Sequence, residues 1–259
     1  LSDVAYMTIQ EKSHILPILG FLSELNLNGI TLDVYGPKSM VEDVLKKIGQ
    51  NQFEFEELNY EDEEDLIDFF KSYYNSFLKT VPAIEVMWEK NQKPKLIIAE
   101  TFAIYARYLA KKHSIPLLVF HSTYFSFHYR DNQYQAQCIK ELKNFTREKS
   151  LAALEEEVAM KYQVRINNVY DLIIEGDLNF SCIPKFIGDL VSFEKENFRY
   201  LGPAYRDESV TDEEFMAFDP IFEKDDKVIY VSLGTVSHNI EGFWFYDTII
   251  EALKDTEHK

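Results

Sequence analysis

Short apolar runs alternate along the chain with longer stretches in which apolar residues recur at every third or fourth position. Continuous apolar runs indicate buried strands, and the longer period indicates helices with one apolar face. Strands are therefore predicted at residues 4–9, 30–36, 96–99, 115–121, 178–183 and 198–203. Helices are predicted at residues 13–27, 41–48, 66–88, 102–112 and 133–162.

The predicted strands lack the polar and apolar alternation of a sheet with one solvated face. Uninterrupted apolar strands separated by helices are typical of a parallel sheet that is covered on both faces. The pattern predicts an α/β fold, a doubly wound, Rossmann-like parallel sheet with right-handed crossovers. Residues 66–88 contain Pro82, which leaves open whether this stretch is one helix or two.

The pattern also predicts a domain organisation. Residues 1–203 form one Rossmann-like domain, and residues 204–226, which are acidic and poorly periodic, form a linker. Residues 227–259 contain one strand, a Gly turn and one helix, which is how a second domain begins. We expect the rest of that domain to be missing, and the apolar residues Phe243, Trp244 and Phe245 to favour self-association.

The composition of the chain excludes some classes of binding partner. The net charge is −17, and no cluster of Lys and Arg is present, which argues against nucleic acid and anionic membranes. Residues 54–68 hold many carboxylates but lack metal-ligand spacing, so no metal is expected. Two Cys without a CxxC motif, and no run long enough for a membrane span, favour the cytoplasm. The sequons at Asn144 and Asn179 are weak evidence for secretion.

The turn after the first strand carries no glycine. It reads Gln-Glu-Lys-Ser-His over residues 10–14, whereas a dinucleotide site needs Gly residues there so that the backbone approaches the pyrophosphate. A nicotinamide enzyme is therefore disfavoured. His14 stands instead at the carboxyl end of this strand, where the start of a helix favours the neutral ring and a neutral ring serves as a general base. The alternative is a capping or packing histidine.

Glu100 directly follows the apolar run 96–99. A carboxylate at this end of the same sheet can reach His14, fix the tautomer of its ring and stabilise the cation that forms when the ring takes a proton. The alternative is that Glu100 only caps the helix that follows.

Two further segments follow predicted strands. After the strand at 115–121 come aromatic side chains that line an apolar ligand pocket or, alternatively, belong to the core, namely Tyr124, Phe125, Phe127, His128 and Tyr129. After the apolar run that starts near residue 228, Ser232, Gly234 and Thr235 can approach a phosphate, although the bare pattern is weak. Walker, GxSxG and HExxH motifs are absent from the sequence.

Several segments carry a resemblance to a known family. Ser13-His14-Ile15-Leu16-Pro17 resembles the GHxNP segment of family 1 nucleotide-sugar-dependent glycosyltransferases, especially their macrolide-type bacterial branch. The segments LIIAETFAIYARYLAKKHSIPLL, GDLNFSCIPKF with FRYLGPAY, and VIYVSLGTVSHN are similar to that branch and occur in the same order.

The resemblance implies two facing Rossmann-like domains, the GT-B architecture. It implies an inverting enzyme that moves a hexose from a UDP-sugar to a hydroxyl of an apolar small molecule bound by the first domain, without cofactor or metal. His14 then matches the base, Glu100 the residue that orients it, and Ser232, Gly234 and Thr235 the turn near the donor phosphates. The chain itself, which lacks most of the donor site, is expected to transfer nothing.

The resemblance is incomplete at the site. Ser13 stands in place of the usual Gly, Leu16 in place of Asn, and Glu100 in place of Asp. A noncatalytic binding or partner module on the same fold is therefore the alternative function.

Overall fold

The computed structural model describes residues 2–9, 12–41, 48, 51–55, 66–122, 149–165, 174–184, 196–202, 229, 231 and 244–254. The chain divides into two compact units, Leu1–Tyr205 and Arg206–Lys259. The predicted boundaries at residues 203 and 226 fall outside the described residues and stay predictions.

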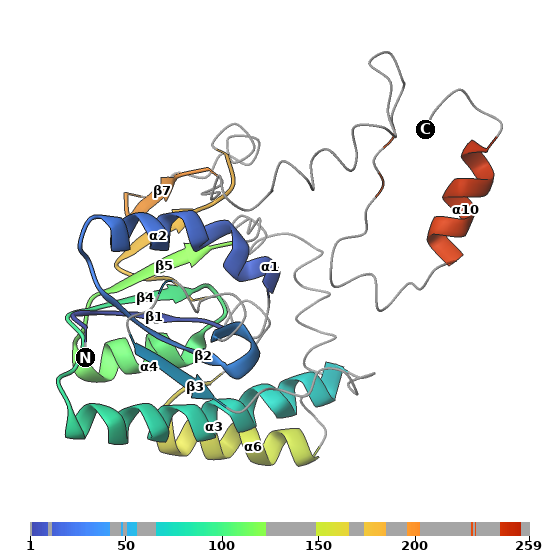
Figure 1. Cartoon of the computed structure of the whole chain (residues 1–259). Helices are drawn as coiled ribbons and strands as arrows, with labels where there is room; N and C mark the ends of the chain where they lie inside the picture. Colours follow the sequence, from blue (N-terminus) through green and yellow to red (C-terminus); the bar gives the residue numbers. More distant parts are fainter. Residues whose placement is uncertain are drawn as a thin grey trace. The chain divides into compact units, whose positions relative to one another are not determined.

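The first unit is built on a parallel sheet of seven strands in the order β3-β2-β1-β4-β5-β6-β7 (Figure 1). Every neighbouring pair in this sheet is parallel. The strands are β1 (Val4–Met7), β2 (Leu32–Pro37), β3 (Asn51–Phe55), β4 (Leu96–Glu100), β5 (Leu117–His121), β6 (Leu178–Ser181) and β7 (Phe198–Tyr200).

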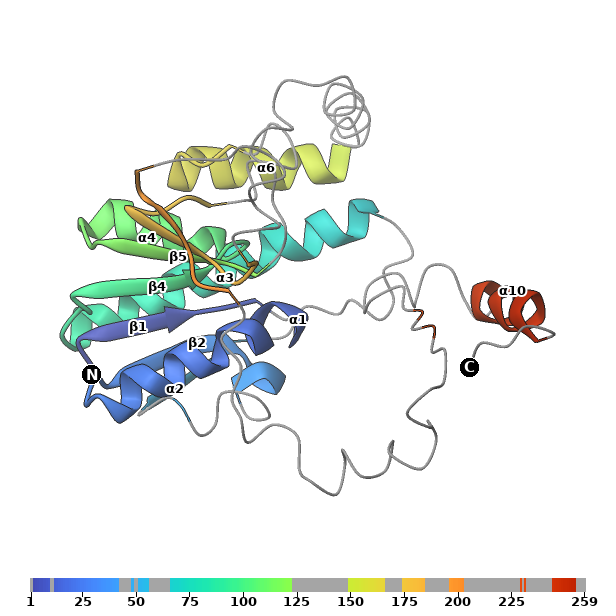
Figure 2. The ribbon, with the colours of Figure 1, turned by 90° about the horizontal axis from the view of Figure 1, so that it is seen from above.

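Helices cover both faces of this sheet (Figure 2). One face carries α1 (Lys12–Ile15), the 3-10 helix η1 (Leu16–Ile18) and α2 (Leu19–Leu27). The other face carries α3 (Leu66–Lys90), α4 (Ile104–His113) and α6 (Lys149–Tyr162). The predicted doubly wound parallel sheet is therefore confirmed.

The sheet separates two apolar cores. On the α3, α4 and α6 face, Trp88 and Phe77 pack with the strand residues Met7, Ala99 and Val119. On the α2 face, the core consists of strand residues adjacent to these, together with residues of the helical segments. Among them are Tyr6, Ile98, Phe120, Ile15, Ile18 and Leu22. Successive strand residues point to opposite faces, so this assignment fixes the direction of each side chain at the strand ends.

A close backbone approach explains one glycine at the start of β6. A Cβ atom on Gly176 would lie 2.4 Å from the carbonyl oxygen of Leu117, closer than a real Cβ atom comes. Glycine therefore lets the chain enter β6 directly beside β5.

Three elements differ from the sequence-based prediction. The edge strand β3 was not predicted, because its sequence NQFEF alternates polar and aromatic residues and lacks an apolar run. Residues 66–90 form one helix that continues through Pro82. The predicted helix at 13–27 is divided by η1, in which Pro17 lies and which has no side-chain cap.

In the second unit, the described structure is the helix α10 (Trp244–Leu253) and two isolated residues. Trp244 and Ile250 of this helix are 60% and 66% exposed. The strand predicted after residue 227 lies almost entirely outside the described residues. No helix in the described part of the chain has the length and apolar character needed to cross a membrane.

Candidate active site

The candidate site lies where the strand order of the sheet reverses. From β1 the chain winds outward to β2 and β3, and it then returns to place β4 on the other side of β1. The connections that leave β1 and β4 therefore diverge, and in open α/β sheets ligands bind at the carboxyl ends of two such strands. His14 lies in α1, just after β1, and Glu100 is the last residue of β4.

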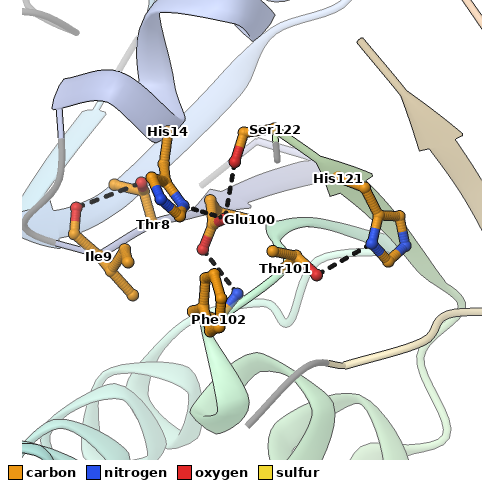
Figure 3. Close-up of polar contacts among 8 residues, drawn as sticks. All are labelled: Thr8, Ile9, His14, Glu100, Thr101, Phe102, His121 and Ser122. Carbon is orange, nitrogen blue, oxygen red and sulfur yellow. Dashed lines mark hydrogen bonds and ion pairs between the residues drawn. The ribbon is translucent and has the colours of Figure 1, made fainter. Parts of the chain in front are cut away.

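The structure brings His14 and Glu100 into contact at this switch point (Figure 3). His14 Nδ1 lies 2.8 Å from Glu100 Oε1, although the two residues are 86 positions apart in the chain. The side chain of His14 is 12% exposed and that of Glu100 is 1% exposed. The Phe102 ring lies beside the imidazole, with 5.3 Å between the ring centroids. The His14 ring is thus oriented by one carboxylate and one aromatic side chain.

Glu100 accepts hydrogen bonds on both carboxylate oxygens. Oε1 receives the Ser122 hydroxyl at 3.2 Å in addition to His14, and Oε2 receives the backbone N–H of Phe102 at 2.6 Å. A carboxylate that only accepts satisfies all these contacts, and His14 must then carry its proton on Nδ1. Glu100 therefore contacts His14 and also holds the backbone N–H of Phe102 in the turn before α4. The N-cap of α4 is Ala103, without a side-chain cap, so Glu100 does not cap this helix.

With its proton on Nδ1, His14 keeps a lone pair on Nε2. Nε2 forms no hydrogen bond to any described residue. The α-helical segment around His14 is only four residues long, so the expected influence of a helix N-terminus is small. The tautomer of the ring follows from Glu100 instead.

A second polar group occupies the opposite face of the sheet at the same edge. Thr101 Oγ1 lies 3.0 Å from His121 Nδ1, and His121 Nε2 lies 3.2 Å from Asn179 Oδ1. All three side chains are buried. Asn179 Oδ1 also accepts the backbone N–H of Gly176, so this oxygen is an acceptor and His121 donates to it from Nε2. Thr101 Oγ1 occupies the other ring nitrogen, Nδ1.

Three further titratable groups lie near the pair. Burial raises the pKa of Tyr6 and of Tyr105 well above the ordinary value for tyrosine, and the charge of Glu100 acts in the same direction. Burial also raises the pKa of the Cys182 thiol to about 12. Tyr105 donates its hydroxyl to the carbonyl oxygen of Thr8 at 2.7 Å. These groups are neutral around pH 7.

The remaining predicted site residues lie outside the described part of the chain. This holds for the proposed acceptor residues Tyr124, Phe125, Phe127, His128 and Tyr129, and for the proposed donor residues Ser232, Gly234 and Thr235. Their placement stays a prediction. Within the described residues, no group of three or more His, Cys, Asp or Glu side chains is arranged to hold a metal ion.

Ser122, Thr101 and Asn179 were not among the site residues predicted from the sequence. Ser122 directly follows a predicted strand at the edge where Glu100 ends its own strand, and that shared position is the signal that would have found it. Asn179 was considered only as part of a sequon. Its side chain is 1% exposed and donates to the carbonyl oxygen of Gly176 at 3.1 Å, so it serves the fold.

Comparison with known proteins shows the same fold in glycosyltransferases. No protein-family model matches the sequence, and no curated protein matches it. Among solved structures, the glycotransferase of kitacinnamycin is similar with a TM-score of 0.72 at 19% identity, covering 98% of this chain and 63% of that protein. CalG4, the calicheamicin glycosyltransferase, is similar with a TM-score of 0.66 at 19% identity. The match covers 98% of this chain and 63% of CalG4.

The spinosyn rhamnosyltransferase SpnG, solved with thymidine diphosphate, is also similar, with a TM-score of 0.61 at 11% identity. This chain covers 62% of SpnG, so it spans less than two thirds of the length of each of these three proteins. At such identities the likeness establishes the fold, which is the Rossmann-like fold of GT-B glycosyltransferases.

Proposed function

We propose that this chain is the acceptor-binding part of an inverting glycosyltransferase that moves a hexose from a nucleoside diphosphate sugar to a hydroxyl of an apolar small molecule. The observation that carries the proposal is the 2.8 Å contact between His14 Nδ1 and Glu100 Oε1 at the switch point of the sheet. The glycosyltransferase fold and the resemblance of the segment around His14 support the same reaction.

In this reaction His14 Nε2 takes the proton of the acceptor hydroxyl. The oxygen attacks the anomeric carbon of the sugar from the side opposite the nucleoside diphosphate, which leaves with the bonding electron pair. The configuration at the anomeric carbon is thereby inverted. Glu100 keeps the Nδ1 proton in place and stabilises the imidazolium that forms. Positioned proton transfer of this kind contributes about 100-fold to 10,000-fold to a rate.

The proposed donor is a UDP-sugar, and Ser232, Gly234 and Thr235 are the residues proposed to contact its phosphates. A dTDP-sugar is the second choice, because SpnG was solved with thymidine diphosphate. Neither donor needs a metal or cofactor in this proposal. The chain alone is expected to bind acceptor weakly and to transfer nothing.

The test is transfer of radiolabelled sugar from UDP-glucose, and in parallel from dTDP-glucose, to a panel of flavonoid and macrolide hydroxyls. This chain is compared with a longer protein that carries a complete donor domain. Product from the longer protein alone supports the proposal. Absence of product from both, with a panel compound still binding near His14, would favour the noncatalytic binding module.

A further inference from the structure

Ser122 shares one oxygen of Glu100 with His14. The Ser122 hydroxyl donates to Oε1 at 3.2 Å, and His14 Nδ1 lies 2.8 Å from the same oxygen. Phe120, two residues earlier in β5, belongs to the core on the α2 face, so Ser122 lies on the same face as His14 and Glu100. The three side chains come from α1, from β4 and from the residue after β5 (Figure 3).

We propose that Ser122 is a positioning residue that sets the pH range in which His14 is a neutral base. It does so by taking part of the negative charge of Glu100 Oε1 away from His14. Its significance for catalysis rests on the function proposed above, whereas its effect on the proton of His14 does not.

Ser122 and His14 compete for one acceptor atom, Glu100 Oε1. Each hydrogen bond to a carboxylate oxygen stabilises the negative charge on that oxygen and weakens its attraction for other donors. Without the Ser122 hydroxyl, Oε1 would interact more strongly with His14 and would stabilise the imidazolium form of the ring. A more basic His14 stays protonated to higher pH and is unable to accept a proton there.

The carboxylate of Glu100 does not depend on Ser122 for its orientation. Oε2 of Glu100 accepts the N–H of Phe102 at 2.6 Å, and this bond holds the carboxylate in place independently of Ser122. Loss of the Ser122 hydroxyl therefore strengthens the effect of the Oε1 charge on His14 and leaves the orientation of the Glu100 carboxylate unchanged.

In the described part of the chain, the other titratable groups near His14 and Glu100 are uncharged around pH 7. Tyr6 of β1 and Tyr105 of α4 are buried, and burial raises the pKa of both. Cys182, which follows β6, has its pKa raised to about 12 by burial. Phe102, at the start of the loop into α4, is uncharged. Among the described side chains, no Lys or Arg forms an ion pair with Glu100.

The experiment follows the His14 ring protons by NMR against pH in this chain, with the signal assigned through the His14→Gln variant. Ser122→Ala should move the midpoint of the His14 titration to higher pH by about 0.3 to 1 unit, because a hydrogen bond of this kind contributes roughly 0.5 to 1.5 kcal/mol. Ser122→Gly, a second variant without the hydroxyl, should move it in the same direction. Ser122→Thr, which keeps a hydroxyl, should follow the wild type.

Ser23→Ala is the matched control. The Ser23 hydroxyl lies on α2 and forms no hydrogen bond to any described residue, so its removal should leave the His14 midpoint unchanged. An unchanged or lowered midpoint in both Ser122→Ala and Ser122→Gly would overturn the proposal. So would a shift in Ser122→Thr equal to that in Ser122→Ala.

This measurement needs neither donor sugar nor transfer. A shifted midpoint together with no transfer by the longer protein would retain the role of Ser122 and reject the glycosyltransferase. Sugar transfer by the longer protein together with an unchanged His14 midpoint would retain the glycosyltransferase and reject the role of Ser122.

Discussion

Glu100 and Thr101 are neighbours in the chain, but their side chains point to opposite faces of the sheet. Glu100 contacts His14 beneath α1, and Thr101 contacts His121 on the α4 face. The alternation of a strand therefore separates two polar groups at one sheet edge. The first leaves a ring nitrogen available for chemistry. The second joins β4, β5 and β6 through buried hydrogen bonds and supports the edge on which the first is built.

His14→Ala is expected to lower kcat about 100-fold to 10,000-fold in the longer protein with a complete donor domain, because the variant lacks the base that takes the acceptor proton. Acceptor affinity should change little, since one partly exposed ring contributes little to binding. Steady-state transfer assays with varied acceptor check both quantities. His113→Gln, at the far end of α4, is the control that removes an imidazole away from the site. Near-normal turnover in His14→Ala would contradict the assigned role.

Glu100→Gln should lower kcat clearly but less than His14→Ala, on the order of 10-fold to 100-fold, because the amide keeps the shape yet carries no charge to support the imidazolium. Glu100→Asp tests the length of the side chain. The shorter carboxylate would withdraw from His14 by about the length of one methylene, so we expect a loss of kcat as well. Full activity in both variants would mean that Glu100 serves only the backbone N–H of Phe102.

Most of the fold was predictable from the sequence, because the strands of a parallel sheet covered on both faces consist of uninterrupted apolar residues. It missed β3, whose alternating residues are typical of a half-exposed edge rather than of the sheet interior. Pro82 did not break α3, since long helices tolerate the loss of one backbone hydrogen bond when their apolar face is packed.

The sequence predicted which residues of the candidate site lie at the ends of strands. His14 and Glu100 each follow an apolar run, so their positions at the carboxyl edge were visible in the sequence. Their adjacency was not, because it depends on β1 and β4 being neighbours in the sheet, a long-range pairing that no local pattern encodes. The same holds for Ser122, whose contact with Glu100 depends on the pairing of β4 with β5.

Thr101→Val is expected to destabilise the first unit by about 1 to 3 kcal/mol, because it removes the hydroxyl that is hydrogen-bonded to the buried His121 Nδ1. Valine keeps the volume of threonine, so cavity formation does not contribute. Urea unfolding followed by far-UV circular dichroism measures the loss. The His14 ring signals should remain at their wild-type positions, since the sheet lies between the two groups. Equal stability of the variant and the wild type would show that the hydrogen bond contributes nothing.

Tyr35 should make the fold sensitive to alkaline pH. Its side chain is 1% exposed, stacks on Phe53 with 4.6 Å between the ring centroids and accepts Trp88 Nε1 at 3.1 Å. Burial raises the pKa of Tyr35 to about 12, above the value near 10 of an unfolded chain. Between these values the unfolded state releases a proton that the folded state retains, so stability falls as pH rises.

The expected contribution to this fall is about 1.4 kcal/mol per pH unit between pH 10 and 12, and it is absent below pH 10. Urea unfolding at a series of pH values from 8 to 12 measures the slope. Tyr35→Phe should remove this part of the slope, and at neutral pH it should cost about 1 kcal/mol because Trp88 Nε1 loses its acceptor. If the slopes of Tyr35→Phe and the wild type coincide above pH 10, Tyr35 does not govern the alkaline limit.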